Sequence, residues 1–188
     1  EQFKNLVKMG RTEGQDAVPM TLGQEFHAFG SQIDGAIEAL RKSEAYLYEV
    51  NMGATAIGTG LTASPGYAEK CVAQLAKITG KPIVGPKDLI AATSSMQAFV
   101  MFSSSYKNLA VTLSKISSDL IFLASGPRNG IFEINLPALQ PGSSIMPGKV
   151  NPVMPEVMNQ VCYKVMGNDA TVTIASRDGL LQLNAYEP

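Results

Sequence analysis

The spacing of apolar residues along the chain predicts a protein built mainly from long helices. Between residues 19 and 50, apolar side chains recur at intervals of three, four and seven, which is typical of an amphipathic helix. These side chains are Phe26, Phe29, Ile33, Ile37, Leu40 and Leu47. Pro19 suits the first turn of a helix, so we expect this helix to begin near it. Further helices are expected over about 64–78, 86–125 and 151–175.

Glycine and proline residues mark the ends of the expected helices. Gly80 follows the second helix and suits a left-handed cap. Gly126 and Pro127 close the third helix, because proline cannot continue it. Residues 51–64 are rich in glycine and threonine and are expected to form a connection. The predicted fold class is therefore all-α, a long-helix bundle.

The chain is expected to have two parts. Residues 1–18 form an extended lead-in segment, and residues 19–188 form one central helical-bundle domain. The sequence begins with Glu1 rather than methionine. We expect it to be an excerpt of a longer chain, with further parts before and after it.

The stretch from Leu89 to Tyr106 has no charged residue, yet it is not uniformly apolar. A membrane-spanning helix is predominantly apolar, so the polar side chains here argue against a span. They are Thr93, Ser94, Ser95, Gln97, Ser103, Ser104 and Ser105. A helix without charge on any side is expected to be buried among other helices.

Composition narrows the class of protein. The net charge is −1 and 16% of residues are charged, so no basic patch for nucleic acid is present. Cys71 and Cys162 lie far apart in apolar contexts and are expected to be free thiols. No secretory leader or transmembrane stretch is recognisable, which predicts a cytoplasmic protein. His27 is the sole histidine, so a histidine-based triad or a multi-histidine metal site is excluded.

The run from Gly142 to Asn151 has the most distinctive chemistry in the chain. It reads GSSIMPGKVN, and it places two hydroxyls, an ammonium and an amide within ten residues. Gly142 and Gly148 permit backbone angles that are closed to other residues, and Pro147 removes a donor. The run is therefore predicted to be a loop that closes over something small and anionic. The alternative is an ordinary surface turn.

This run resembles the GSSxMPxKxN motif of the fumarase/aspartase superfamily, and the resemblance extends over essentially all 188 residues. Other segments similar to the family are Gly10–Thr12, Gln15–Phe26, Gly53–Leu61 and Ser125–Arg128. Two segments, Glu133–Pro137 and Pro155–Cys162, resemble the aspartase branch rather than the fumarase branch.

The resemblance implies an enzyme that reversibly eliminates ammonia from L-aspartate, in the anti sense, to give fumarate. It also implies a homotetramer in which long helices of four subunits form one bundle, with no cofactor and no metal. One alternative is a fumarase or another dicarboxylate lyase of the superfamily. A second is a helical assembly module that is inactive as it stands, because the family's first shared region is missing here.

The resemblance also assigns roles to individual residues. Ser143 is the base, acting as an alkoxide formed when the loop closes, with Ser144 and Met146 beside it. Lys149 and Asn151 bind a substrate carboxylate, and Thr12 supplies a hydroxyl to the site of a neighbouring subunit. The alternatives are that Lys149 is a solvated loop cation and Thr12 a turn former.

One position departs from the family pattern. After Gly10-Arg11-Thr12 this chain has Glu13-Gly14, where fumarases have histidine and many aspartases have glutamine or histidine. Glu156 corresponds to the carboxylate that pairs with that histidine in fumarases. We expect the two carboxylates to approach across a subunit interface, where one would hold a proton. The departure leaves the identity of the dicarboxylate open.

Overall fold

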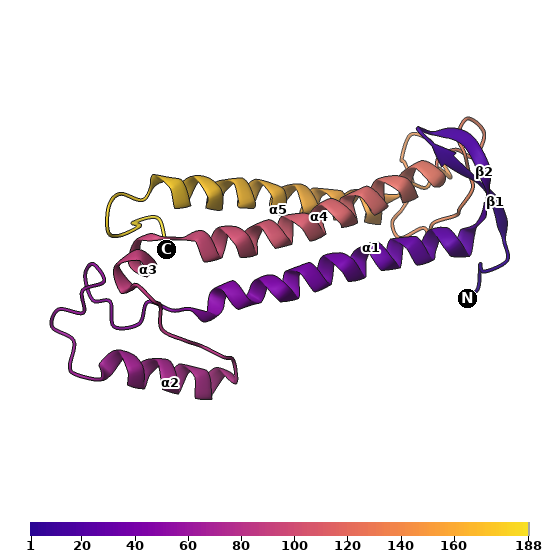
Figure 1. Ribbon diagram of the computed structural model, residues 1–188. Helices are drawn as coiled ribbons and strands as arrows, with labels where there is room; N and C mark the ends of the chain where they lie inside the picture. Colours follow the sequence, from indigo (N-terminus) through magenta and orange to yellow (C-terminus); the bar gives the residue numbers. More distant parts are fainter. Residues whose placement is uncertain (188) are drawn as a thin grey trace. The chain divides into compact units, whose positions relative to one another are not determined.

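A computed structural model describes residues 1–187 and is predominantly helical (Figure 1). Its elements are β1 (Val7–Thr12), β2 (Gln15–Thr21), α1 (Leu22–Ser43), the 3₁₀ helix η1 (Glu44–Tyr48), α2 (Tyr67–Thr79), α3 (Leu89–Ser94), α4 (Gln97–Leu123) and α5 (Val153–Asp178). The helical class predicted from the sequence is confirmed. The two-stranded sheet β1–β2 was not predicted, so the fold is not purely helical.

The chain forms two compact units. The first unit contains Glu1–Glu38 and Thr112–Asn159. The second contains Ala39–Val111 and the part of the chain from Gln160 onward. The helices α1, α4 and α5 each contribute residues to both units. Every residue predicted for the catalytic site belongs to the first unit.

The first unit opens with a hairpin. Strands β1 and β2 pair in the antiparallel sense, with Thr12 opposite Gln15. Glu13 and Gly14 form the two-residue turn, and both have positive φ angles, 53° and 78°. Two left-handed residues in succession match the twist of a hairpin, which explains why glycine follows Glu13.

Helix α1 begins at Leu22 rather than near Pro19, and local chemistry explains the difference. Pro19 lies in β2, opposite Met9. The Thr21 hydroxyl accepts from the Gln24 amide at 3.1 Å, and the Gln24 side chain accepts from the Thr21 amide at 2.9 Å. This reciprocal pair is a capping box, and it fixes the first turn of α1 three residues later than expected.

Side chains from three helices form the interior of the first unit. Phe29 of α1 is 7% exposed, and the Lys115 ammonium of α4 lies 5.8 Å from the centre of its ring. Asn159 of α5 is buried and accepts a hydrogen bond from the Ser114 hydroxyl of α4 at 2.9 Å. A buried amide needs such a partner, so this bond fixes the pairing of α4 with α5 in this unit.

The single helix expected over residues 86–125 is two helices, α3 and α4. Asp88 accepts from the amides of Ile90 and Ala91 at 2.9 and 3.0 Å, which starts α3 at Leu89. Ser95 has φ −91° and ψ 123°, an extended conformation that ends α3. Its hydroxyl accepts from the Gln97 amide at 3.4 Å. Serine hydroxyls compete with the backbone in this way, and here they break the helix.

The other two helices lie close to their predicted positions. Helix α2 ends at Gly80, whose φ of 66° is left-handed and whose amide donates to the Ala76 carbonyl. This confirms the predicted glycine cap. Helix α5 covers the predicted range 151–175 within three residues at each end. Both cysteines are free thiols, and Cys162 of α5 is buried.

In the second unit, a buried carboxylate of α5 contacts three side chains of α4. Asp169 of α5 is 4% exposed. It accepts from the Ser103 and Ser104 hydroxyls of α4 at 2.8 and 3.4 Å. The Lys107 ammonium lies 2.5 Å from its second oxygen. Burial is the largest influence on the pKa of Asp169 and raises it, but the hydrogen bonds and the charge of Lys107 together outweigh burial and lower the pKa.

This lowered pKa predicts a distinct dependence of stability on pH. The ordinary value is 3.8, so the unfolded chain takes up this proton at a higher pH than the folded chain does. The stabilisation is complete above the unfolded-state pKa and is lost as pH falls through the folded-state pKa. We expect Asp169→Asn, in the full-length protein, to lower the melting temperature at neutral pH. The variant should also flatten the fall of melting temperature below about pH 4, because asparagine does not titrate there.

Melting temperatures between about pH 5 and about pH 2.5 test this expectation. The control is Asp178→Asn, which removes a carboxylate that is 42% exposed beside Arg177. Equal acid slopes for the wild type and Asp169→Asn would contradict the assignment.

None of the helices described in residues 1–187 is long and apolar enough to span a membrane.

Candidate active site

The run from Gly142 to Lys149 is a loop, as its composition predicted, and two backbone hydrogen bonds hold it together. The Ser143 amide donates to the Lys149 carbonyl at 3.3 Å, and the Lys149 amide donates to the Met146 carbonyl at 3.1 Å. A Cβ atom on Gly142 would lie 2.6 Å from the Lys149 carbonyl oxygen, so only glycine permits this closure. Gly148 has a φ of 80°, which also favours glycine.

The Ser143 hydroxyl lies inside the turn that this loop makes. Its Oγ accepts from the Ile145 amide at 3.3 Å and from the Met146 amide at 3.2 Å. The Ser143 residue is half-buried, whereas Ser144 is exposed. Two amide dipoles that point at one oxygen favour negative charge on it. The loop thus distinguishes the first of the two serines from the second.

The remaining residues of the motif lie around the same loop. Lys149 and Met146 are exposed, and Asn151 is half-buried. The Asn151 carbonyl accepts from the Val153 amide at 2.9 Å, where α5 begins. An exposed ammonium and an amide at a helix start are available to an anion, since helix N-termini also favour negative charge.

Thr12 and Glu13 lie at the tip of the hairpin and are exposed. Glu156 is exposed in the first turn of α5, where a carboxylate interacts favourably with the helix dipole. In the described part of the chain, no hydrogen bond or ion pair joins Thr12 or Glu13 to the Ser143 loop or to Glu156. The pairing of Glu13 with Glu156 was expected between subunits and stays a prediction.

A cluster of charged side chains joins the hairpin to the segment that precedes the Ser143 loop. We call it the Glu133 cluster, and its members are Lys8, Arg11, Glu25 and Glu133. The Lys8 ammonium lies 2.6 Å from a Glu25 oxygen and 2.5 Å from Oε1 of Glu133. Arg11 donates to Oε2 of Glu133 at 2.6 Å. In Figure 1 the hairpin and the connection between α4 and α5 lie at the same end of the unit.

The Glu133 carboxylate is held in its charged form. Its side chain is 17% exposed, and that of Lys8 is 6% exposed. Burial is the largest influence on the pKa of Glu133 and raises it. The hydrogen bonds and charges of Lys8 and Arg11 together outweigh burial and lower the pKa. The cluster is therefore an ionised network that excludes much of the solvent.

Sequence reasoning identified the segment Glu133–Pro137 only as a mark of resemblance and gave Glu133 no role. Lys8 and Glu25 were not singled out either. The available signal was a lysine in the apolar, β-prone run Leu6–Met9, where an unpaired charge is costly to bury.

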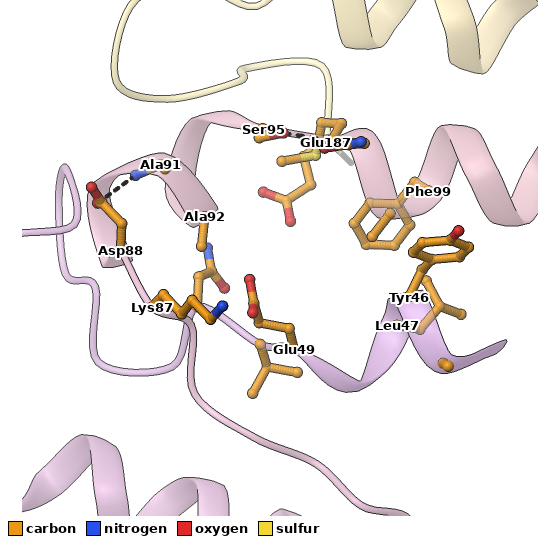
Figure 2. A pocket seen from close by; sticks show the side chains of 16 residues that line it. Tyr46, Leu47, Glu49, Lys87, Asp88, Ala91, Ala92, Ser95, Phe99 and Glu187 are labelled. Atoms are coloured by element: carbon orange, nitrogen blue, oxygen red, sulfur yellow. Dashed lines mark hydrogen bonds between the residues drawn. The ribbon is translucent and has the colours of Figure 1, made fainter. Parts of the chain in front are cut away.

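A pocket in the second unit has a volume of about 690 Å³ (Figure 2). Its charged lining residues are Glu49, Lys87, Asp88 and Glu187, so carboxylates outnumber ammonium groups. Such a lining repels a dicarboxylate. None of the residues predicted for the catalytic site lines this pocket. Among residues 1–187, no group of three or more His, Cys, Asp or Glu side chains is arranged to hold a metal ion.

A family model described as "Lyase" matches residues 1–167, and the chain belongs to this lyase family. The resemblance to the fumarase/aspartase superfamily, read from the motifs, is confirmed.

The chain is also similar in sequence to individual curated proteins. The chain is 58% identical over 188 residues to the aspartate ammonia-lyase of Pseudomonas aeruginosa, covering 40% of that protein. It is 57% identical over 187 residues to the aspartate ammonia-lyase of Escherichia coli K12, covering 39% of it. All of this chain is covered in both cases. The chain thus spans about two fifths of the length of the curated relatives it matches.

Solved structures agree with this placement. A fumarate lyase:delta crystallin from Brucella melitensis bound to cobalt has a TM-score of 0.95 and 53% identity, with all of this chain and 41% of the other covered. A class II fumarase from Schistosoma mansoni has a TM-score of 0.92 and 37% identity, with 97% of this chain and 41% of the other covered. The fold is therefore that of the fumarate lyases.

Proposed function

We propose that this chain is part of an aspartate ammonia-lyase that converts L-aspartate reversibly to fumarate and ammonia. The observation that carries the proposal is the 58% identity to a curated aspartate ammonia-lyase along the whole of this chain. The closed loop around the Ser143 hydroxyl supports a mechanism. Because the chain covers only part of its relatives, the activity belongs to the full-length protein.

In this proposal Ser143 is the base. Its Oγ, as an alkoxide, takes the proton from the substrate Cβ, and the electrons of that bond give a dianionic aci-carboxylate. The Cα–N bond then breaks, ammonia leaves, and the double bond of fumarate forms. The proton on Ser143 returns to solvent. The amides of Ile145 and Met146, at 3.3 and 3.2 Å from Oγ, stabilise the alkoxide.

Lys149 and Asn151 are proposed to bind the substrate carboxylate that gains charge. An ammonium and an amide together supply charge-assisted and neutral hydrogen bonds to a carboxylate. Stabilising the dianion contributes more to the rate than the base does, because carbon acids of this kind are very weak. Ser144 and Met146 lie beside the base in the same loop.

Thr12 is proposed to act in the site of a neighbouring subunit within a homotetramer. This agrees with its exposed position at the hairpin tip. Large apolar side chains on α4 and α5 also remain exposed in this chain, which supports burial by other subunits. They include Phe99, Met101, Tyr106, Val111, Val157 and Val161. The two free thiols agree with a cytoplasmic enzyme, since cytosolic thiols stay reduced.

Turnover by the full-length protein tests the proposed function. We expect kcat/KM for L-aspartate to exceed that for L-malate by roughly a hundredfold or more, since the site must recognise an amino group rather than a hydroxyl. Fumarate formation is followed by ultraviolet absorbance, and sedimentation of the same preparation gives the oligomeric state. Preferential turnover of malate would instead make the protein a fumarase. An active monomer would contradict the shared site.

Glu13 offers a test of substrate recognition. If it faces a substrate carboxylate, Glu13→Gln keeps the hydrogen-bonding shape and removes a negative charge. We expect kcat/KM for aspartate to hold or rise, because the neutral amide does not place a like charge beside the dianion as a carboxylate does. The measurement is kcat/KM against pH for both forms of the full-length enzyme. Superimposable profiles would show that Glu13 points away from the site.

A further inference from the structure

The backbone around Glu133 is fixed to the end of α4. The Glu133 amide donates to the Leu123 carbonyl at 2.9 Å, and the Phe132 amide donates to the Ser125 carbonyl at 2.8 Å. These bonds fold the segment back on the last turn of the helix. The Glu133 carboxylate therefore projects from a defined point, ten residues before Ser143.

The hairpin meets this carboxylate beside an irregularity in the pairing of β1 with β2. Lys8 and Arg11 are three residues apart, so in a regular strand their side chains point to opposite faces. The pairing register shifts between Met9 and Arg11. Over this shift β1 advances two residues and β2 advances three, from Pro19 to Asp16, so the extra residue lies in β2. Lys8 and Arg11 nevertheless both reach Glu133. A Cβ on Gly10 would lie 3.0 Å from the Val18 carbonyl oxygen, so a small residue is needed at this close approach.

We propose that Glu133 is a positioning residue that sets the hairpin tip and the Ser143 loop in one fixed relation. Arg11 directly precedes Thr12, and it donates to Oε2 of Glu133 at 2.6 Å. Lys8 lies 2.5 Å from Oε1. Each oxygen of the carboxylate thus meets one cation of the hairpin, which resists rotation of the carboxylate as well as translation.

The consequence concerns the assembly. Glu133 aligns two segments of the chain. One is the hairpin, whose Thr12 is proposed to act in the site of a neighbouring subunit, and the other leads to the loop that carries the proposed base, Ser143. The expected loss of kcat rests on the proposed function. The ion pairs that join Glu133 to the hairpin belong to this unit alone and do not depend on that function. Misplacing reacting groups by about 1 Å can cost up to about a hundredfold in rate, so loss of this link should lower kcat.

Glu133→Gln in the full-length protein tests the proposal. The matched control is Glu44→Gln, which breaks a more exposed ion pair with Lys81 at 2.6 Å. We expect Glu133→Gln to reduce kcat for aspartate roughly ten- to a hundredfold per active site, with a smaller change in KM. The control should keep the wild-type kcat.

Backbone hydrogen exchange, followed by mass spectrometry, supplies a readout that does not depend on the substrate. Glu133→Gln should speed exchange in residues 8–12 and also in residues 142–149, while the control leaves both unchanged. Because Glu133→Gln leaves one excess positive charge in the Glu133 cluster, which could impair folding, the double variant Lys8→Met with Glu133→Gln is measured as well. It should show the same faster exchange in both segments while keeping the wild-type melting temperature.

Two results for Glu133→Gln would overturn the positioning role and leave Glu133 as a stabilising ion pair. One is a wild-type rate of hydrogen exchange in the 142–149 loop, and the other is a lower melting temperature with unchanged kcat. If the wild type does not deaminate aspartate, the proposed function fails. The exchange comparison still decides the positioning role in that case.

Discussion

Ser143→Ala should reduce kcat for aspartate in the full-length enzyme by about a hundredfold or more, because it removes the proposed base. The fold should survive. The bonds that close the loop join the Ser143 amide to the Lys149 carbonyl and the Lys149 amide to the Met146 carbonyl, and neither uses the hydroxyl. The amides of Ile145 and Met146 lose an acceptor, but they lie in an exposed loop where water can replace it.

The matched control is Ser144→Ala, which removes an exposed hydroxyl from the next residue of the same loop. Its loss of kcat should be at least about ten times smaller, since no proton transfer depends on it. Steady-state kinetics with the concentration of active sites determined for each variant gives the comparison. A Ser143→Ala enzyme that keeps more than about a tenth of the wild-type kcat would contradict the base role.

The sequence predicted the local structure correctly where that structure depends on residues adjacent along the chain. Gly80 was predicted to cap a helix because a left-handed residue must follow α2, and its φ of 66° confirms this. The Ser143 loop was predicted from glycines around a polar run. Gly142 is needed there because a Cβ would lie 2.6 Å from the Lys149 carbonyl oxygen.

Two local predictions were wrong because hydroxyl groups outweighed the apolar pattern. The helix expected from Pro19 begins at Leu22, since Thr21 and Gln24 cap it reciprocally. The helix expected over 86–125 breaks at Ser95, although apolar residues continue on both sides. Thr21 and Gln24 cap the start of α1, whereas the Ser95 hydroxyl accepts from the Gln97 amide where the longer helix is interrupted. The spacing of apolar residues reveals neither bond.

The Glu133 cluster lay beyond sequence reasoning for a different reason. Arg11 and Glu133 are 122 residues apart, so no local pattern contains their pairing. Alternation along β1 would place Lys8 and Arg11 on opposite faces, so the sequence did not indicate that both reach one carboxylate. The contributions proposed for neighbouring subunits are also long-range, which is why they came from family resemblance alone.

Lys149→Ala should lower kcat/KM for aspartate by roughly a hundred- to a thousandfold, through both a higher KM and a lower kcat. In the proposed mechanism the charge of Lys149 meets a carboxylate that gains negative charge in the transition state, so its loss weakens transition-state binding more than substrate binding. Folding should be unaffected, because Lys149 is exposed in this chain. Lys149→Arg keeps the charge but changes the shape of the cation. Its kcat/KM should fall between those of the wild type and Lys149→Ala.

The control for charge alone is Lys77→Ala, which removes an exposed ammonium from the last turn of α2. It should leave kcat and KM unchanged, since α2 contributes no proposed site residue. Separate determination of kcat and KM for each variant makes the comparison. If Lys149→Ala behaved like Lys77→Ala, Lys149 would be a solvated loop cation, and the substrate carboxylate would be bound by Asn151 and groups of neighbouring subunits.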